Sequence, residues 1–74
     1  MPHISIKHFP AELTQQERKD LSDVISSSIQ RALQCSEDVI SVSMEEVAPE
    51  DWMADVFHPE IAAKRQYLIK QPNY

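Results

Sequence analysis

The chain has 74 residues, with seven Lys and Arg against twelve Asp and Glu and a formal net charge of −5. A chain of this length forms one domain, spanning residues 1–74, and buries only about 60% of its unfolded surface. The scattered basic residues argue against a nucleic-acid partner, the lack of glycine excludes glycine-rich phosphate loops, and no apolar run approaches the roughly 20 residues of a membrane span.

The first predicted element is a strand over residues 3–9, in which Ile4 and Ile6 alternate with polar residues. Pro10 ends this strand. Thr14 and Glu17 have the spacing of a capping box, which predicts a helix that runs from there to about Leu33. Apolar residues recur in this helix at spacings of three and four, which predicts one stripe facing a sheet: Leu21, Val24, Ile25, Ile29, Ala32 and Leu33.

A second strand is predicted over residues 39–47, where apolar and polar residues again alternate. Residues 48–59 are predicted to be irregular, because Pro49 and Pro59 act as breakers. A short helix is predicted from about Pro59 to Lys70, with Ile61, Leu68 and Ile69 on its apolar side.

The order strand, helix, strand indicates an α/β (α+β) fold class: one right-handed β-α-β unit with parallel strands. Parallel strands are normally covered on both faces and belong to wider sheets, whereas two strands alone leave both edges open. A homodimer that joins two such units into a four-stranded sheet is therefore the minimum assembly that we expect.

The residues most often used for chemistry do not form a site in this sequence. His3 and His8 are five residues apart in a strand, so they point to opposite faces and do not share a metal ion. Cys35 has no adjacent base to activate its thiol. We therefore expect no metal and no cofactor. The single cysteine and the lack of a signal-peptide core indicate a cytoplasmic protein.

Pro2 is a candidate for a catalytic base. If Met1 is removed, the chain begins with a secondary amine, which is a good base. Pro2 shares strand parity with Ile4 and Ile6, so it faces the apolar side, where loss of water disfavours the charged ammonium and leaves the amine able to accept a proton. Proline at position 2 alone is a weak indication, because many chains carry it for no catalytic reason.

The order of elements strengthens the hypothesis about Pro2. A proline followed by an alternating strand, a long capped helix and a second strand resembles the 4-oxalocrotonate tautomerase family over nearly the whole chain. The opening residues 1–7, the segment 49–52 and the residues 68–74 resemble a dimeric bacterial branch of that family. The resemblance implies a β-α-β protomer assembled into dimers or hexamers, with the terminal proline as the catalytic base.

The sequence departs from the family pattern where substrate is held. The best-studied members of the family bind a dicarboxylate with two arginines, one just before the long helix and the other early in the second strand. Those places are taken here by Leu13 and Ser41, neither of which pairs with a carboxylate as arginine does. The family's pocket aromatic matches Trp52, and Phe57 is a second candidate for a pocket wall. The resemblance, with these departures, thus implies a monocarboxylate or aryl substrate. A structural alternative for Trp52 is that its ring fills the dimer interface.

The sequence predicts a homodimeric keto–enol tautomerase, an isomerase, in which Pro2 moves a proton within the enol of a small 2-oxo acid. The candidates for stabilising the enolate oxygen are backbone amides, the indole N–H of Trp52, Arg31 and His58. Two alternatives stay open. One is a hydratase or dehalogenase activity on the same fold, and the other is a non-catalytic dimeric module that binds an aromatic carboxylate.

Overall fold

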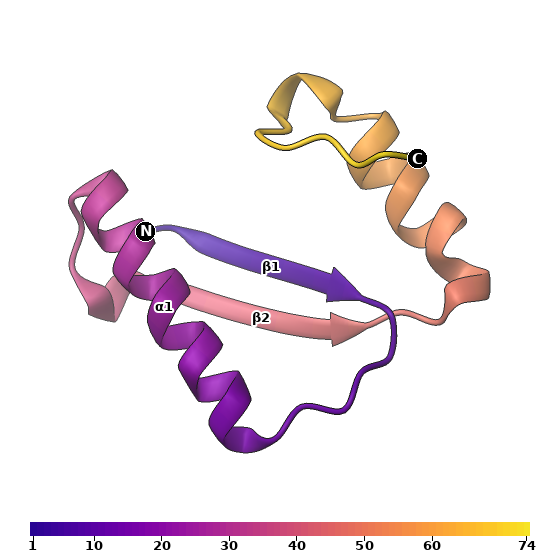
Figure 1. Cartoon of the computed structure of the whole chain (residues 1–74). Helices are drawn as coiled ribbons and strands as arrows, with labels where there is room; N and C mark the ends of the chain where they lie inside the picture. The colour runs from indigo at the N-terminus through magenta and orange to yellow at the C-terminus, as the bar shows by residue number, and fades with distance from the viewer.

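The computed structural model describes all of residues 1–74 and contains the β-α-β unit (Figure 1). Strand β1 (His3–His8) and strand β2 (Ser41–Glu46) form a two-stranded parallel sheet, and helix α1 (Gln15–Leu33) connects them. Ile4 lies opposite Val42 and Ile6 opposite Met44, so the apolar residues of both strands share one face. The predicted fold class and parallel pairing are confirmed.

Helix α1 begins with the predicted capping box. The Thr14 hydroxyl accepts a hydrogen bond from the Glu17 amide at 3.0 Å, and the Glu17 carboxylate accepts one from the Thr14 amide at 3.0 Å. These bonds hold the pKa of the Glu17 carboxyl below its ordinary value. The helix ends at Gln34, whose φ of 51° is left-handed. Glycine usually takes this position, and this chain has none.

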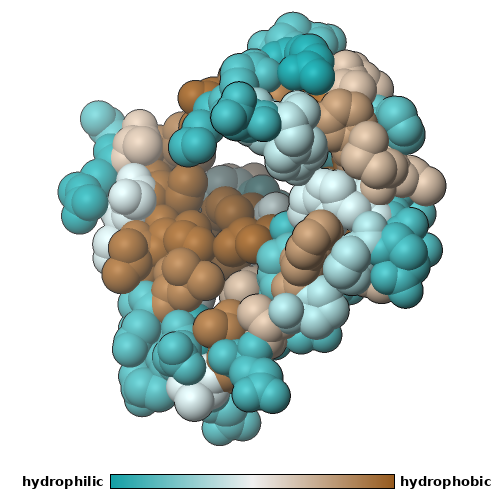
Figure 2. All heavy atoms as spheres, turned by 45° about the vertical axis from the view of Figure 1, so that its right-hand side comes forward, coloured by the Kyte–Doolittle hydropathy of each residue, from teal (hydrophilic) through white to brown (hydrophobic).

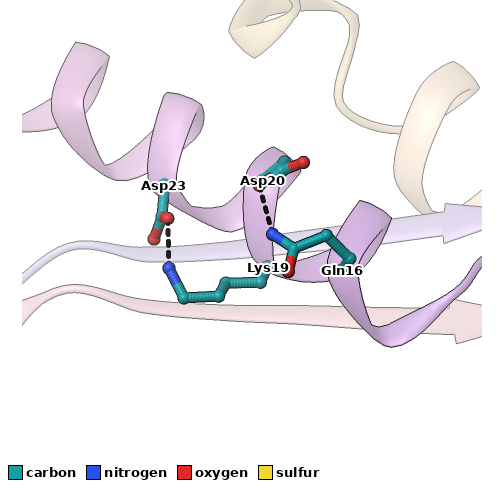
Figure 3. Close-up of polar contacts among 4 residues, drawn as sticks. All are labelled: Gln16, Lys19, Asp20 and Asp23. Carbon is teal, nitrogen blue, oxygen red and sulfur yellow. Dashed lines mark hydrogen bonds and ion pairs between the residues drawn. The ribbon is translucent and has the colours of Figure 1, made fainter.

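The exposed surface of α1 carries two side-chain bonds across single helical turns (Figure 3). The Gln16 amide donates to Asp20 at 2.8 Å, and the Lys19 ammonium contacts the Asp23 carboxylate at 2.7 Å. Hydrogen bonding to Asp23 raises the pKa of Lys19. These pairs stabilise the helix only weakly, because both members are exposed to water. No helix of the chain has both the length and the apolar content to cross a membrane.

The predicted irregular segment 48–59 and the helix predicted from Pro59 to Lys70 are wrong. A 3₁₀ turn η2 (Pro49–Asp51) leads into a π-type helix η3 (Met53–Ala62), and a 3₁₀ turn η4 (Arg65–Tyr67) follows. Pro59 lies inside η3 and does not start it. Proline lacks an amide hydrogen and clashes with the preceding turn of an α-helix, whereas a π-type helix has a wider turn with bonds across five residues. The Ala63 amide makes such a bond to the His58 carbonyl at 3.1 Å.

A single chain encloses almost no core. Only Val47 and Val56 are buried, at 8% and 6% exposure. In the predicted stripe of α1, Ile25 and Ile29 are half-buried, whereas Val24 is 68% exposed. Figure 2 shows apolar side chains gathered on an open area of the surface. The large exposed apolar residues are Met1, Phe9, Leu21, Val24, Leu33, Met53, Tyr67, Ile69 and Tyr74.

Candidate active site

Pro2 lies just before β1, at the end of the sheet where both strands begin. It is half-buried, and its carbonyl accepts a hydrogen bond from the Ser41 amide at 3.2 Å. The next residue, His3, is hydrogen-bonded through Nδ1 to the Ser41 hydroxyl at 2.6 Å. The structure therefore joins Pro2 and Ser41 through their backbones across adjacent strands, whereas the Ser41 side chain is bonded to His3.

A pocket of about 580 Å³ opens at the other end of the sheet, where both strands finish. Trp52 forms one wall and meets the ring of Phe9 edge-on, with centroids 5.2 Å apart. The indole N–H of Trp52 donates a hydrogen bond to the Tyr74 hydroxyl at 3.0 Å. The volume suits one small ligand. The lining residues are Lys7, His8, Phe9, Pro49, Trp52, Met53 and Tyr74.

Phe57 belongs to the same end of the molecule but stands behind the pocket. This half-buried ring of η3 lies 5.8 Å from the ring of Tyr74 and 5.3 Å from the imidazole of His58. Phe57 is therefore absent from the pocket lining and supports it through Tyr74. The segment after η4 returns beside η3, as Figure 1 shows, and this return places Tyr74 against Trp52.

Leu13 lies neither beside Pro2 nor in the Trp52 pocket. It lies before α1 in a separate shallow depression that it shares with Thr14, Arg18 and Glu46, and it does not line the Trp52 pocket. Pro2 and Trp52 are also apart, because Pro2 precedes β1, whereas Trp52 comes after β2 at the opposite end of the parallel sheet (Figure 1). A strand of this length spans roughly 20 Å. Within one chain, the predicted site residues therefore do not converge on a single cavity.

The charged residue of the pocket, Lys7, is already paired. Its ammonium forms an ion pair with the Glu60 carboxylate, which η3 holds against the sheet. Hydrogen bonding to Glu60 raises the pKa of Lys7 despite partial desolvation, and the charges of Glu60, Glu45 and Asp55 add to this effect. Lys7 thus stays cationic, but Glu60 balances its charge, so the pocket lining offers no unpaired lysine or arginine.

Of the two ring nitrogens of His8, one is hydrogen-bonded within the chain and the other is buried. Its Nδ1 lies 2.6 Å from the Phe9 carbonyl oxygen, and because a carbonyl oxygen only accepts, Nδ1 carries the hydrogen. Its Nε2 is buried without a hydrogen-bond partner. His8 therefore presents no accessible donor to a molecule in the pocket.

Of the pocket residues, sequence reasoning found only Trp52 and missed the other six: Lys7, His8, Phe9, Pro49, Met53 and Tyr74. No short-range pattern indicates Tyr74, because its contact with Trp52 depends on the return of a segment without regular structure. Of the donors considered from the sequence, the Trp52 N–H is taken up by Tyr74. Arg31 lies exposed in the last turn of α1, and His58 is exposed on η3. Neither lines the pocket.

The β-α-β fold, with a proline directly before its first strand, is matched by a protein family. Residues 2–58 match the family described as "Tautomerase enzyme". The chain therefore belongs to the tautomerase family and is an isomerase, which confirms the class predicted from the sequence.

Relatives named "Tautomerase PptA" cover the full chain. The protein from Escherichia coli O127:H6 is 42% identical over 74 residues, and that from Cronobacter sakazakii is 38% identical. The protein from Pectobacterium carotovorum subsp. carotovorum is 34% identical. Each alignment covers 100% of this chain and 97% of the relative. The resemblance to a bacterial branch of the family is thus confirmed by sequence identity along the whole length.

Proposed function

We propose that this tautomerase interconverts the enol and keto forms of small 2-oxo acids, with aryl or other monocarboxylate substrates preferred. The base is the nitrogen of Pro2, freed by removal of Met1. The family match begins at this residue, which supports the assignment. The half-buried Cys35 has no disulfide partner, and this free thiol supports a cytoplasmic location.

The proposed chemistry needs one proton carrier and no cofactor. The neutral Pro2 amine accepts the proton of the enol hydroxyl, and the electron pair of the broken O–H bond forms the carbonyl as the double bond shifts. The resulting prolinium returns its proton to carbon 3 of the substrate, so the amine is regenerated. A positioned base of this kind typically contributes 10²–10⁴-fold to the rate.

The separation of Pro2 from the Trp52 pocket supports a site built from two copies. If two sheets join edge to edge about a two-fold axis, the strands that meet run antiparallel. The beginning of a strand in one copy then lies toward the end of the facing strand in its partner. In such a dimer, Pro2 of one copy approaches the Trp52 pocket of the other.

The near absence of a core supports the same dimer. Burial of apolar surface is the main favourable term in folding, and a single chain buries only Val47 and Val56. The strands β1 and β2 pair only with each other, so each has a free edge able to accept another strand. A second copy covers both the open edge and the exposed apolar residues, including Leu21 and Val24 of α1.

The observation that carries the substrate assignment is an aromatic pocket without an arginine. Phe9, Trp52 and Tyr74 supply rings, and no guanidinium lines the cavity. At the two positions where the family pattern has substrate-binding arginines, Leu13 is apolar and Ser41 is already bonded to His3. An aryl side chain gains contact in this cavity, whereas a second carboxylate gains no bidentate partner.

A test combines mass spectrometry with two substrates. The purified protein should lack Met1 and should ketonise the enol of phenylpyruvate with a higher kcat/KM than a dienol dicarboxylate. A matched preparation that keeps Met1, in which the Pro2 nitrogen is an amide, should be inactive. Full activity with Met1 retained would contradict the role of Pro2, and preference for the dicarboxylate would contradict the substrate class.

A further inference from the structure

The polar side chains of the Trp52 pocket differ in whether their hydrogens are available to a ligand. The Trp52 N–H donates to Tyr74, the His8 Nδ1–H donates to the Phe9 carbonyl, and Lys7 is paired with Glu60. The Tyr74 hydroxyl differs, because it accepts the Trp52 hydrogen bond while its own hydrogen has no acceptor in the chain. It is the one lining side chain with an uncommitted neutral donor.

The surroundings of Tyr74 hold its ring in place and leave its face accessible. Its ring packs 5.8 Å from Phe57, and its hydroxyl is fixed at 3.0 Å from the Trp52 nitrogen. The residue is nevertheless 63% exposed, so a ligand can reach it. A hydroxyl that accepts a hydrogen bond is polarised, and its own O–H becomes a stronger donor. Trp52 therefore both orients and strengthens the donor of Tyr74.

We propose that the Tyr74 hydroxyl donates a hydrogen bond to the carboxylate of the substrate and thereby makes the pocket selective for aryl monocarboxylic acids. This inference rests on the proposed function for the identity of the substrate, but the binding site itself stands on the pocket geometry. Tyr74 supplies a single neutral donor, which suits one carboxylate beside an aromatic ring. Trp52 acts on the carboxylate through Tyr74 and is a positioning residue in this respect.

The charge of the molecule makes such a donor useful. The protein has a formal net charge of −5, and the Lys7 charge is balanced by Glu60. An anionic substrate therefore finds no unpaired cation in the pocket. A hydrogen bond from a neutral hydroxyl to a carboxylate is charge-assisted and stronger than one between neutral groups. It holds the anion without adding a charged side chain to an apolar cavity.

The test measures binding of phenylacetate and of its methyl ester, which do not undergo tautomerisation. Trp52 is the only tryptophan, so its fluorescence reports on the pocket directly. Tyr74→Phe keeps the ring and removes the hydroxyl. It should weaken phenylacetate binding by about tenfold or more, since a hydrogen bond to a charged group is lost, and should change ester binding by much less. Tyr67→Phe, at an exposed tyrosine outside the pocket, is the matched control and should change neither.

The outcomes separate this inference from the proposed function. Equal weakening of acid and ester by Tyr74→Phe would show that the hydroxyl only supports Trp52, and that result would overturn the inference. So would unchanged phenylacetate affinity, or no phenylacetate binding by the unmodified protein. Selective loss of acid binding supports it even if the protein proves inactive on phenylpyruvate enol, a result that would remove the proposed reaction alone.

Discussion

The two ends of the parallel sheet differ in structure and in the chemistry that they provide. Where the strands begin, Pro2 lies beside a polar pair formed by His3 and Ser41, and no deep cavity accompanies it. Where the strands finish, Phe9, Trp52 and Tyr74 enclose an apolar pocket. One end supplies the proposed base, and the other supplies the pocket that we propose selects the substrate.

This difference follows from the parallel topology. In a β-α-β unit both strands run in the same direction, so the loops that follow them meet at the same end of the sheet. The segments after β1 and β2 therefore build the pocket together, through Phe9 from one and Trp52 from the other. Pro2 directly precedes β1, so it lies at the opposite end of the sheet. Within this topology, a second chain is the simplest means of uniting the two ends.

Replacing the base should produce the largest effect. Pro2→Ala converts the secondary amine to a primary one and should lower kcat/KM for phenylpyruvate enol by about 10²-fold or more, the usual worth of a positioned base. The pocket at the other end should be untouched, so phenylacetate should quench Trp52 fluorescence as in the unmodified protein. Equal loss of binding and activity would show that the two ends do not have separate roles.

Mixing two impaired variants tests whether the ends combine between copies. Pro2→Ala and Trp52→Ala should each be weak alone. Unfolding and refolding them together should restore about a quarter of normal activity, because random pairing makes half of the dimers mixed and each mixed dimer has one intact site of two. Light scattering should give about twice 8.5 kDa throughout. No gain on mixing, with dimers present, would place both residues in one chain's site.

A smaller change should sharpen the difference in substrate choice. Ser41→Arg installs a guanidinium at the Pro2 end, where the Ser41 amide bonds the Pro2 carbonyl. A charge-assisted hydrogen bond to a second carboxylate should raise kcat/KM for a dicarboxylate enol by about tenfold. Ser5→Arg, on the same sheet face and farther along β1, is the matched control. An equal gain in both variants would indicate general attraction of anions.

The elements with strong local patterns were predictable from the sequence. Alternation identified both strands, and the spacing of Thr14 and Glu17 identified the start of α1, because these signals arise from neighbouring residues. The segment after β2 was mispredicted because Pro59 was interpreted as a breaker, whereas the wide turns of η3 accommodate it. Local rules for α-helices do not describe this geometry.

The residues of the proposed site were predictable from the sequence only in part, for a related reason, and the role of Pro2 stays a prediction. Pro2 has distinctive chemistry that is visible at its own position, and Trp52 was identified through its match to a family. Tyr74 has no such signal, since it becomes part of the pocket only through its contacts with Trp52 and Phe57. Trp52 and Tyr74 are 22 residues apart in the sequence. Such contacts depend on the path of the chain in space, which periodicity does not encode.

The smallest predicted effect concerns the capping box, which fixes the start of α1 beside the pocket end of the sheet. Hydrogen bonds from Thr14 lower the pKa of Glu17 below its ordinary value of 4.5 in the folded protein. A carboxyl with a lowered pKa binds protons more readily in the unfolded chain, so it stabilises the fold above about pH 4.5. This stabilisation should be lost as the pH falls through the folded-state pKa.

Thermal melts of the unmodified protein and Glu17→Gln, followed by circular dichroism between pH 3 and 6 at fixed protein concentration, measure this effect. The difference in Tm should be largest near pH 6 and should shrink as the pH falls, because protonated Glu17 no longer accepts the Thr14 amide bond as a carboxylate. Glu12→Gln, at an exposed acid that makes no side-chain hydrogen bond, is the matched control. Thr14→Ala should lower stability by about 1 kcal/mol at pH 7, with little effect on activity, since Thr14 lies outside the Trp52 pocket. A pH-independent difference for Glu17→Gln would mean that the side chain contributes through its shape and helix propensity, and that its charge is immaterial to the cap.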